Sequence, residues 1–321
     1  MNLEKIKLIC FVFNKYFLLK ALTSSFTITK KFIFSLFFTL ICIVFTLFCS
    51  ENLQNIASSL GILSFGILHG ANDIKILSSK KMKINSLFGV SFLLIYLVVV
   101  FSGILLFYFI PGIALLSFVA VSCYHFGEQH WQDKLNDIKR PLPFYITYGS
   151  LIFLMLFSFH YSQVEEIIFR ISSVHIPYQF FFVSLIITGN IFLGYIFIKL
   201  KNIKHILLEI FLLGALAILF YTGSLLFGFG IYFVIWHSLP SLKSQIKYLY
   251  PEKEDRPYLK YFKSAFLYWI MALIGLVTMY FFGTLPKDQY LSVFFSFLAA
   301  ITFPHVIVMG LMFHSPNQNS N

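Results

Sequence analysis

Four histidines of this chain lie inside strongly apolar stretches, where a metal ion is one of the few reasons to keep an imidazole. They are His69, His125, His237 and His305. Neutral imidazole is a common metal ligand, and several imidazoles together suit iron, zinc or copper. Polar side chains inside membrane-length apolar segments are costly, so they indicate function. We therefore treat these four histidines as candidate metal ligands.

Two acidic residues and a tryptophan stand close to these histidines in the sequence. Asp73 follows His69 by four residues and Glu128 follows His125 by three, so on a continuous helix each carboxylate shares a face with its histidine. Each carboxylate is then a further ligand or the group that orients the imidazole, unless it is a helix-end charge that faces water. Trp236, beside the third histidine, is an interfacial anchor or a pocket wall. Glycines near the sites are assigned a role in close helix packing: Gly66, Gly70, Gly127, Gly228 and Gly230.

The composition indicates the elements that must position these residues. Of 321 residues, 59% are hydrophobic and only 12% are charged, whereas a soluble domain has roughly 25% charged residues. A membrane-spanning helix needs roughly 20 mostly apolar residues. Ten segments qualify: 32–49, 55–74, 86–110, 112–131, 144–161, 179–200, 204–221, 224–240, 264–283 and 290–313. We predict an all-α, polytopic transmembrane helical bundle of ten spans.

The basic residues orient this bundle. With the N-terminus in the cytoplasm, the inner segments hold 22 Lys and Arg residues, and the outer segments hold only Arg170 and Lys287. Cytoplasmic loops of membrane proteins are enriched in basic residues, so both termini are predicted to be cytoplasmic. The net charge of +11 is therefore a sign of topology, and no nucleic-acid partner is expected.

Three regions follow from this pattern. Residues 1–31 are expected to form a basic cytoplasmic or interfacial arm, residues 32–314 the transmembrane catalytic domain, and residues 315–321 a short tail. The lipid bilayer is the expected surrounding, and the multi-pass topology is assigned to the cell inner membrane.

The four histidines share one depth in this arrangement. Counted from the outer end of its span, each lies 13 to 15 residues in, which is about 20 Å at a helical rise of 1.5 Å per residue. The four spans that carry them also run in the same direction. A lone intramembrane histidine usually bonds a neighbouring helix, but four at one depth favour a single site in the cytoplasmic third of the bilayer.

The motifs around the histidines resemble those of the Brp/Blh family of bacterial and archaeal membrane β-carotene 15,15′-dioxygenases. They read Gly66-Ile-Leu-His69-Gly-Ala-Asn-Asp73, Ser122-Cys-Tyr-His125-Phe-Gly-Glu128, Trp236-His237-Ser-Leu and Phe303-Pro304-His305. The His-Gly-Ala-x-Asp and His-Phe-Gly segments, about 55 residues apart, are the most specific part. The likeness extends over roughly residues 55–310.

The resemblance implies that the chain cleaves the central 15,15′ double bond of β-carotene with O₂ to give two molecules of all-trans-retinal. It also implies a non-haem Fe(II) held by histidines, with His69, His125 and His237 as ligands and catalytic residues. The family's setting makes a retinal-binding microbial rhodopsin the consumer of the product. β-Carotene and O₂ both dissolve in lipid, so an intramembrane site rich in Phe and Leu suits them.

The sequence departs from the family pattern at one position. Some members have a second histidine four residues after the one that matches His237, and here that residue is Ser241. The fourth ligand is therefore open. We favour His305 because of its depth, and the alternatives are a three-histidine site or one completed by Asp73 or Glu128.

Other functions are compatible with buried histidines. A di-iron carboxylate hydroxylase or desaturase would need more carboxylates and clustered His-x-x-His motifs, whereas here the four candidate histidines are dispersed over four different helices. A transporter or proton channel could use histidines as relays, and its helices would often show repeats or breaks. A bis-histidine haem protein would give a Soret band. We expect the oxygenase.

Overall fold

The computed structural model describes residues 30–79, 86–135, 141–200, 206–250, 253–282 and 290–314, and these residues form helices and connections without a strand. The predicted all-α class is therefore confirmed. Nearly all of the expected arm 1–31 and the whole of the expected tail 315–321 lie outside the described residues.

The helices follow the apolar segments of the sequence. They are α3 (Lys30–Phe48), α4 (Glu51–Gly61), α5 (Asp73–Leu77), α6 (Ser86–Phe109), α7 (Pro111–Trp131), α8 (Leu142–Phe159), α9 (Tyr161–Ser172), α10 (Tyr178–Tyr195), α11 (Ile206–Thr222), α12 (Leu225–Ile231), α13 (Leu239–Leu249), α14 (Pro257–Phe282) and α15 (Tyr290–Phe313). Three π-helical segments extend them: η1 (Ile62–Gly66), η4 (Ile196–Leu200) and η5 (Tyr232–Ser238). A 3₁₀ turn, η3 (Gln132–Lys134), follows α7.

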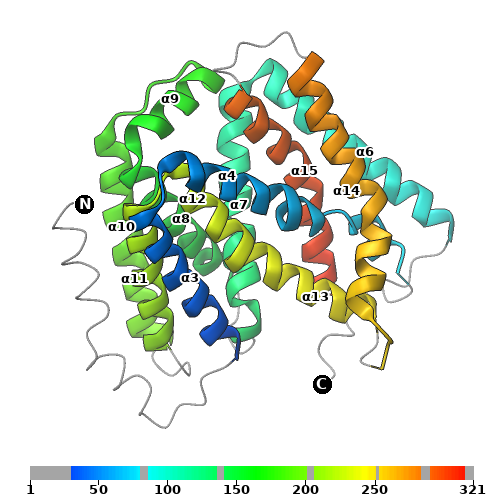
Figure 1. The fold of residues 1–321 in the computed structure, drawn as a ribbon, viewed down its shortest axis with the longest axis horizontal. Coiled ribbons are helices and arrows are strands. Elements are labelled where there is room, and N and C mark those ends of the chain that lie inside the picture. Colours follow the sequence, from blue (N-terminus) through cyan, green and yellow to red (C-terminus); the bar gives the residue numbers. More distant parts are fainter. Residues whose placement is uncertain are drawn as a thin grey trace.

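The helices form one bundle with two flanks (Figure 1). On one flank α8 packs against α10 and α7, and α11 packs against α3. On the other flank α15 packs against α6 and against α7. The segments α4 and α12 cross the middle in contact with each other. Because α7 contacts α8, α6 and α15, it connects the two flanks.

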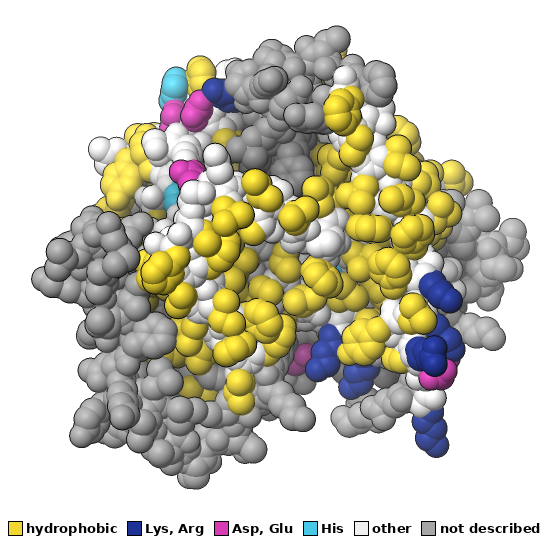
Figure 2. All heavy atoms as spheres, in the orientation of Figure 1, with side chains coloured by type: hydrophobic (Ala, Val, Ile, Leu, Met, Phe, Trp, Pro, Cys, Tyr) yellow, Lys and Arg dark blue, Asp and Glu magenta, His cyan; other side chains and the backbone are white. Residues whose placement is uncertain are grey.

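The surface has the character of a protein within a bilayer. Five helical stretches are long and apolar enough to cross a membrane: Leu142–Phe159, Tyr178–Ile198, Leu225–Leu249, Pro257–Thr278 and Ser296–Phe313. Figure 2 shows apolar side chains over most of the visible described face, with basic side chains gathered at one end of it. Exposed apolar residues such as Phe197 (73%) and Phe281 (72%) would be costly in water and are ordinary in lipid. The chain is thus a polytopic membrane protein, while ten spans and cytoplasmic termini stay predictions.

Two glycines bring α7 and α8 into backbone contact. A Cβ placed on Gly127 would lie 2.0 Å from the carbonyl oxygen of Tyr145, and one on Gly149 would lie 1.9 Å from that of Cys123. No larger residue fits at either position. The expected packing role of Gly127 is borne out, and the sequence did not single out Gly149.

The expected span 55–74 differs most from the structure. Its helix runs through α4 and η1 but ends in a turn at residues 69–72, and the short helix α5 follows. The reason is tertiary, because the side chains of Gln245 on α13 and Tyr261 on α14 both donate hydrogen bonds to the His69 carbonyl. The helix α9, on the connection before α10, was not expected either. It is amphipathic: Val164 is its one buried residue, and Glu165 and Glu166 follow Val164 directly in the sequence.

Candidate metal centre

The four predicted histidines meet in the middle of the bundle. His69 comes from the turn after η1, His125 from α7, His237 from η5 and His305 from α15. The ring centroids of His69 lie 5.1 Å from those of His237 and 4.8 Å from those of His305. His125 lies 4.8 Å from His237 and 5.3 Å from His305. The rings thus form a closed cycle in which each histidine has two neighbours.

This cycle is fully buried and rich in unused ligand atoms. Each of the four residues is 1–5% exposed. Within the described part of the chain, these ring nitrogens have no hydrogen-bond partner: His69 Nδ1, both nitrogens of His125, His237 Nδ1 and His305 Nε2. Buried polar atoms are nearly always paired, so this many unpaired nitrogens in one place make the cycle a candidate metal site.

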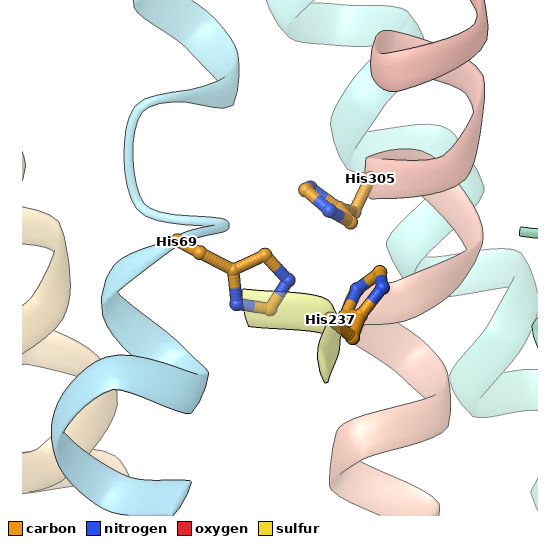
Figure 3. Close-up of side chains that lie close together, drawn as sticks. All are labelled: His69, His237 and His305. Carbon is orange, nitrogen blue, oxygen red and sulfur yellow. The ribbon is translucent and has the colours of Figure 1, made fainter. Parts of the chain in front are cut away.

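The spacing suits such a cation. One nitrogen each from His69, His237 and His305 lies within 4.8 Å of the others, and Figure 3 shows these three rings turned toward a common centre. Metal–nitrogen bonds of about 2.0–2.1 Å place opposite nitrogens about 4 Å apart. These three nitrogens are therefore candidates for one shared site, and His125 is outside this close set. His125 belongs to the cycle through its ring contacts.

A carboxylate fixes the orientation of His305. Nδ1 of His305 lies 2.9 Å and 3.0 Å from the two carboxylate oxygens of Asp73, and Asp73 is 1% exposed. An ionised carboxylate only accepts hydrogen bonds, so Nδ1 donates and Nε2 keeps its lone pair for a ligand bond. The Tyr96 hydroxyl also donates to Asp73.

Asp73 therefore differs from both geometric expectations based on sequence spacing. It was expected to orient or accompany His69, or to face water at a helix end. The helix stops at His69, so the two residues do not share a helical face, and the carboxylate bonds the histidine of α15 instead. The sequence therefore identified Asp73 as a candidate beside the histidines, but it did not predict that the partner of Asp73 is His305.

A network from α13 and α14 holds the turn that presents His69. The Gln245 side-chain amide donates to the His69 backbone carbonyl at 2.8 Å, and the Tyr261 hydroxyl donates to the Gln245 side-chain oxygen Oε1 at 2.7 Å. Asn72, at the end of the turn, donates to the Tyr261 carbonyl and accepts from Ser264. Gln245 and Tyr261 are fully buried, and no motif in the sequence pointed to them. Both residues lie between the expected spans 224–240 and 264–283, so the sequence offered no signal for them.

Local helix irregularities lie beside three of the four histidines. His237 lies in η5, and η1 ends three residues before His69. Such π-helical turns are rare and occur frequently at functional sites. On α15, Pro304 directly precedes His305, and a proline inside a helix removes one backbone hydrogen bond. His125 needs no irregularity, because the glycine contact with α8 fixes α7 beside it.

Glu128 and Trp236 are buried but bond elsewhere. The Glu128 carboxylate accepts a hydrogen bond from Tyr124, one turn earlier on α7. The Trp236 indole nitrogen donates to Thr39 on α3 at 3.1 Å, and its ring stacks on His130. Burial of Trp236 to 4% exposure rules out the interfacial anchor. Its contacts support a packing role on the side of η5 away from the cycle.

Ser241 lies apart from the histidine cycle. It is fully buried and accepts a hydrogen bond from Gln245 at 3.1 Å, and its hydroxyl contacts the Met309 sulfur. It does not line the cavity that contains the four histidines. Ser241 thus stands where some family members have the second histidine of an i, i+4 pair, and here it belongs to the hydrogen-bond network that supports His69.

Two apolar cavities meet beside the histidines. The small cavity, of about 170 Å³, is lined by all four histidines together with aromatic residues. The large cavity, of about 700 Å³, lies among α7, α8, α9, α10 and α12. Phe118, Phe153 and Phe229 line both, and we call these three residues the neck. A metal in the cycle would therefore face the small cavity, which borders a larger apolar space across the neck, and such surroundings suit a hydrocarbon substrate.

Three other described histidines make contacts away from the cycle. His130 and Lys134 both bond the Glu209 carboxylate, at 2.8 Å and 2.6 Å. His160 bonds a backbone carbonyl of α11, and His175 pairs with Glu165 on α9. None of these side chains lines the small cavity.

Comparison with known proteins agrees with the site. The sequence model of the family described as Beta-carotene 15,15′-dioxygenase matches residues 60–313, a range that contains the whole histidine cycle and its supporting network. No curated protein matches the chain, and no solved structure matches it.

Proposed function

The chain belongs to the β-carotene 15,15′-dioxygenase family, and from that premise we propose that it cleaves the central double bond of β-carotene with O₂ to give two molecules of all-trans-retinal. The observation that carries the proposal is the buried cycle of four imidazoles facing an apolar cavity. One O₂ supplies the two aldehyde oxygens, so the reaction balances without a further reductant.

We assign the cofactor as Fe(II), held by His69, His125, His237 and His305. Four neutral imidazoles suit iron, and they leave coordination positions for O₂. When bound, the iron supplies the activation of O₂ that the protein's own side chains cannot provide. Asp73 keeps the Nδ1 proton on His305, so that Nε2 faces the site.

The remaining residues orient the substrate and exclude water. Phe126 lies 4.6 Å and Phe233 5.6 Å from the His237 ring, centroid to centroid. These rings offer apolar surface to a polyene beside the histidines. Burial of apolar surface at roughly 25 cal/mol per Å² is the main source of affinity for such a ligand.

The setting follows from the same chemistry. A substrate that dissolves in lipid is expected to reach the site from the bilayer, and we place the protein in the cell inner membrane. Retinal is a chromophore precursor, and a microbial rhodopsin is the proposed consumer.

The test is expression in a bacterial strain that accumulates β-carotene, with chromatography of both carotenoid and retinal. The wild type should consume β-carotene and form retinal, and His69→Ala and His237→Ala should not. His175→Ala, a histidine on the α9 side with 71% of its side chain exposed, is the matched control and should behave as the wild type. A well-expressed, iron-supplied wild type that forms no retinal would refute the proposal.

A further inference from the structure

The large cavity adjoins the histidine site, and the proposed reaction does not yet assign it a role. We propose that it is a chamber for one arm of the polyene, and that its depth determines which double bond lies at the histidines. This inference rests on the proposed function and adds the basis of its positional selectivity. The specificity residues are those that line the chamber above the neck, represented by Leu115, Val119 and Ile168.

The chamber borders the histidine cavity. Phe118 on α7, Phe153 on α8 and Phe229 on α12 line both cavities, so a rod-like ligand in the histidine cavity would enter the chamber by passing between these three rings. The Phe126 ring, beside His237, stacks on Phe153 with centroids 5.5 Å apart. An unbroken aromatic surface thus leads from the histidines to the chamber.

The chamber has the chemistry of a hydrocarbon site. Among the described residues that line it, none has a charged side chain and Ser172 is the one with a polar side chain. The Ser172 hydroxyl already donates to a backbone carbonyl of α9 at 2.7 Å. Ligand pockets have volumes of about 300–1,000 Å³, and the chamber, at about 700 Å³, is in that range. A polar ligand would find no partner here.

Its length also matches half of the substrate. Along α7, Phe118 is seven residues and Gly112 thirteen residues before His125. At 1.5 Å per residue these positions lie about 10 Å and about 20 Å from the histidine layer. One arm of β-carotene, from the central bond to the end of its ring, spans on the order of 15 Å at ordinary bond lengths. With the central bond at the histidines, the end ring therefore lies inside the chamber.

The second arm has a separate path. The small cavity is lined on its other side by Tyr268 and Ala272 of α14, and Tyr268 is 44% exposed. This side of the cavity therefore reaches the surface that faces lipid. A substrate that enters from α14 stops when its leading ring fills the chamber, and this stop places the central bond at the histidines.

The test uses a tryptophan to shorten the chamber. Leu115→Trp puts a large ring about 15 Å from the histidine layer, where the end ring of the substrate would lie. Ala120→Trp, on the same helix but exposed and outside both cavities, is the matched control. Each variant is given β-carotene and, separately, a β-carotene shortened at one end to an aldehyde.

Leu115→Trp should cleave β-carotene at least ten-fold more slowly than the wild type and cleave the shortened substrate within about two-fold of it. The short arm still fits the reduced chamber, which is why the second activity survives. Ile168→Trp, from α9, should repeat this pattern and covers the case that one variant fails to fold. Equal loss on both substrates, or equal retention on both, would overturn the chamber.

A binding measurement separates the chamber from the catalytic proposal. All-trans-retinol has the length of one arm, and its fluorescence anisotropy reports binding to the purified protein without turnover. Leu115→Trp should weaken this binding at least ten-fold relative to Ala120→Trp. If the wild type forms no retinal but shows this difference, the proposed function fails and the chamber stands. If retinal forms and retinol binding is unchanged in Leu115→Trp, the chamber fails and the function stands.

Discussion

Replacement of Asp73 by asparagine is the most direct test of how the site is organised. The change keeps the size of the side chain and removes the negative charge that faces Nδ1 of His305 at 2.9–3.0 Å. An asparagine can also present its NH₂ group to the ring, which would reverse the tautomer of His305 and aim the protonated nitrogen at the metal.

The magnitude follows from the contacts. A hydrogen bond to a charged group contributes about 1.5–3 kcal/mol and a neutral one about 0.5–1.5, so loss of the charge costs roughly 1–1.5 kcal/mol. That corresponds to about ten-fold in metal affinity. Removal of a histidine's orienting partner costs about 10–100-fold in general. We therefore expect Asp73→Asn to bind Fe(II) at least ten-fold more weakly than the wild type.

The assay is a competition titration of Fe(II) against a chelator, on protein purified in detergent, with product formation measured at each iron level. Asp73→Asn should regain much of its activity at high iron, which a merely misfolded protein would not do. Glu165→Gln is the control, because Glu165 also pairs with a histidine, His175, but on α9 outside the small cavity. Wild-type iron affinity in Asp73→Asn would refute the orienting role.

Three further predictions test the elements that carry the site. Gly149→Ala should lower the melting temperature sharply or abolish folding, because its Cβ would overlap a carbonyl oxygen of α7 at 1.9 Å, whereas Gly189→Ala, with open space, should be neutral in the same thermal assay. Gln245→Leu should destabilise the protein by about 1–3 kcal/mol, since it removes the shorter of two hydrogen bonds to the buried His69 carbonyl and the side-chain acceptor of the Tyr261 hydroxyl; an unchanged melting temperature would contradict this. His305→Ala should weaken Fe(II) binding in the same titration by more than the roughly 100-fold upper limit for an orienting partner, and a smaller effect would remove it from the ligand set.

The sequence predicted the helices and the meeting of the histidines for a simple physical reason. Membrane spans are continuous apolar runs, and equal depth along parallel spans translates directly into proximity once the helices pack. The expected span 112–131, for example, is α7 (Pro111–Trp131), and His125 lies on it at the depth of the cycle. Local pattern and spatial arrangement agree wherever a helix is regular.

The expectation failed where tertiary contacts override the helix. Asp73 bonds His305 on α15 because the chain leaves the helix at His69. That turn is stabilised by the Gln245 side chain, which donates a hydrogen bond to the His69 carbonyl. A residue 176 positions away leaves no trace in local periodicity. The π-turn at His237 and the contact made by Gly149 are of the same kind, since each depends on a neighbour that only the folded chain supplies.

The same network bears on the fourth imidazole. Gln245 bonds both the His69 carbonyl and the Ser241 hydroxyl, and its amide nitrogen also lies 3.5 Å from the Met309 sulfur. Met309 is one turn after His305 on α15, so position 241 faces the contact between α13 and α15. A histidine at 241 would need the room that Met309 occupies and would disturb the donor that holds the His69 turn. In this chain a fourth imidazole at position 241 on α13 would therefore disturb the hydrogen bond from Gln245 that holds the His69 turn. An imidazole on α15 would not. This argument, independent of depth, supports His305 as the fourth ligand.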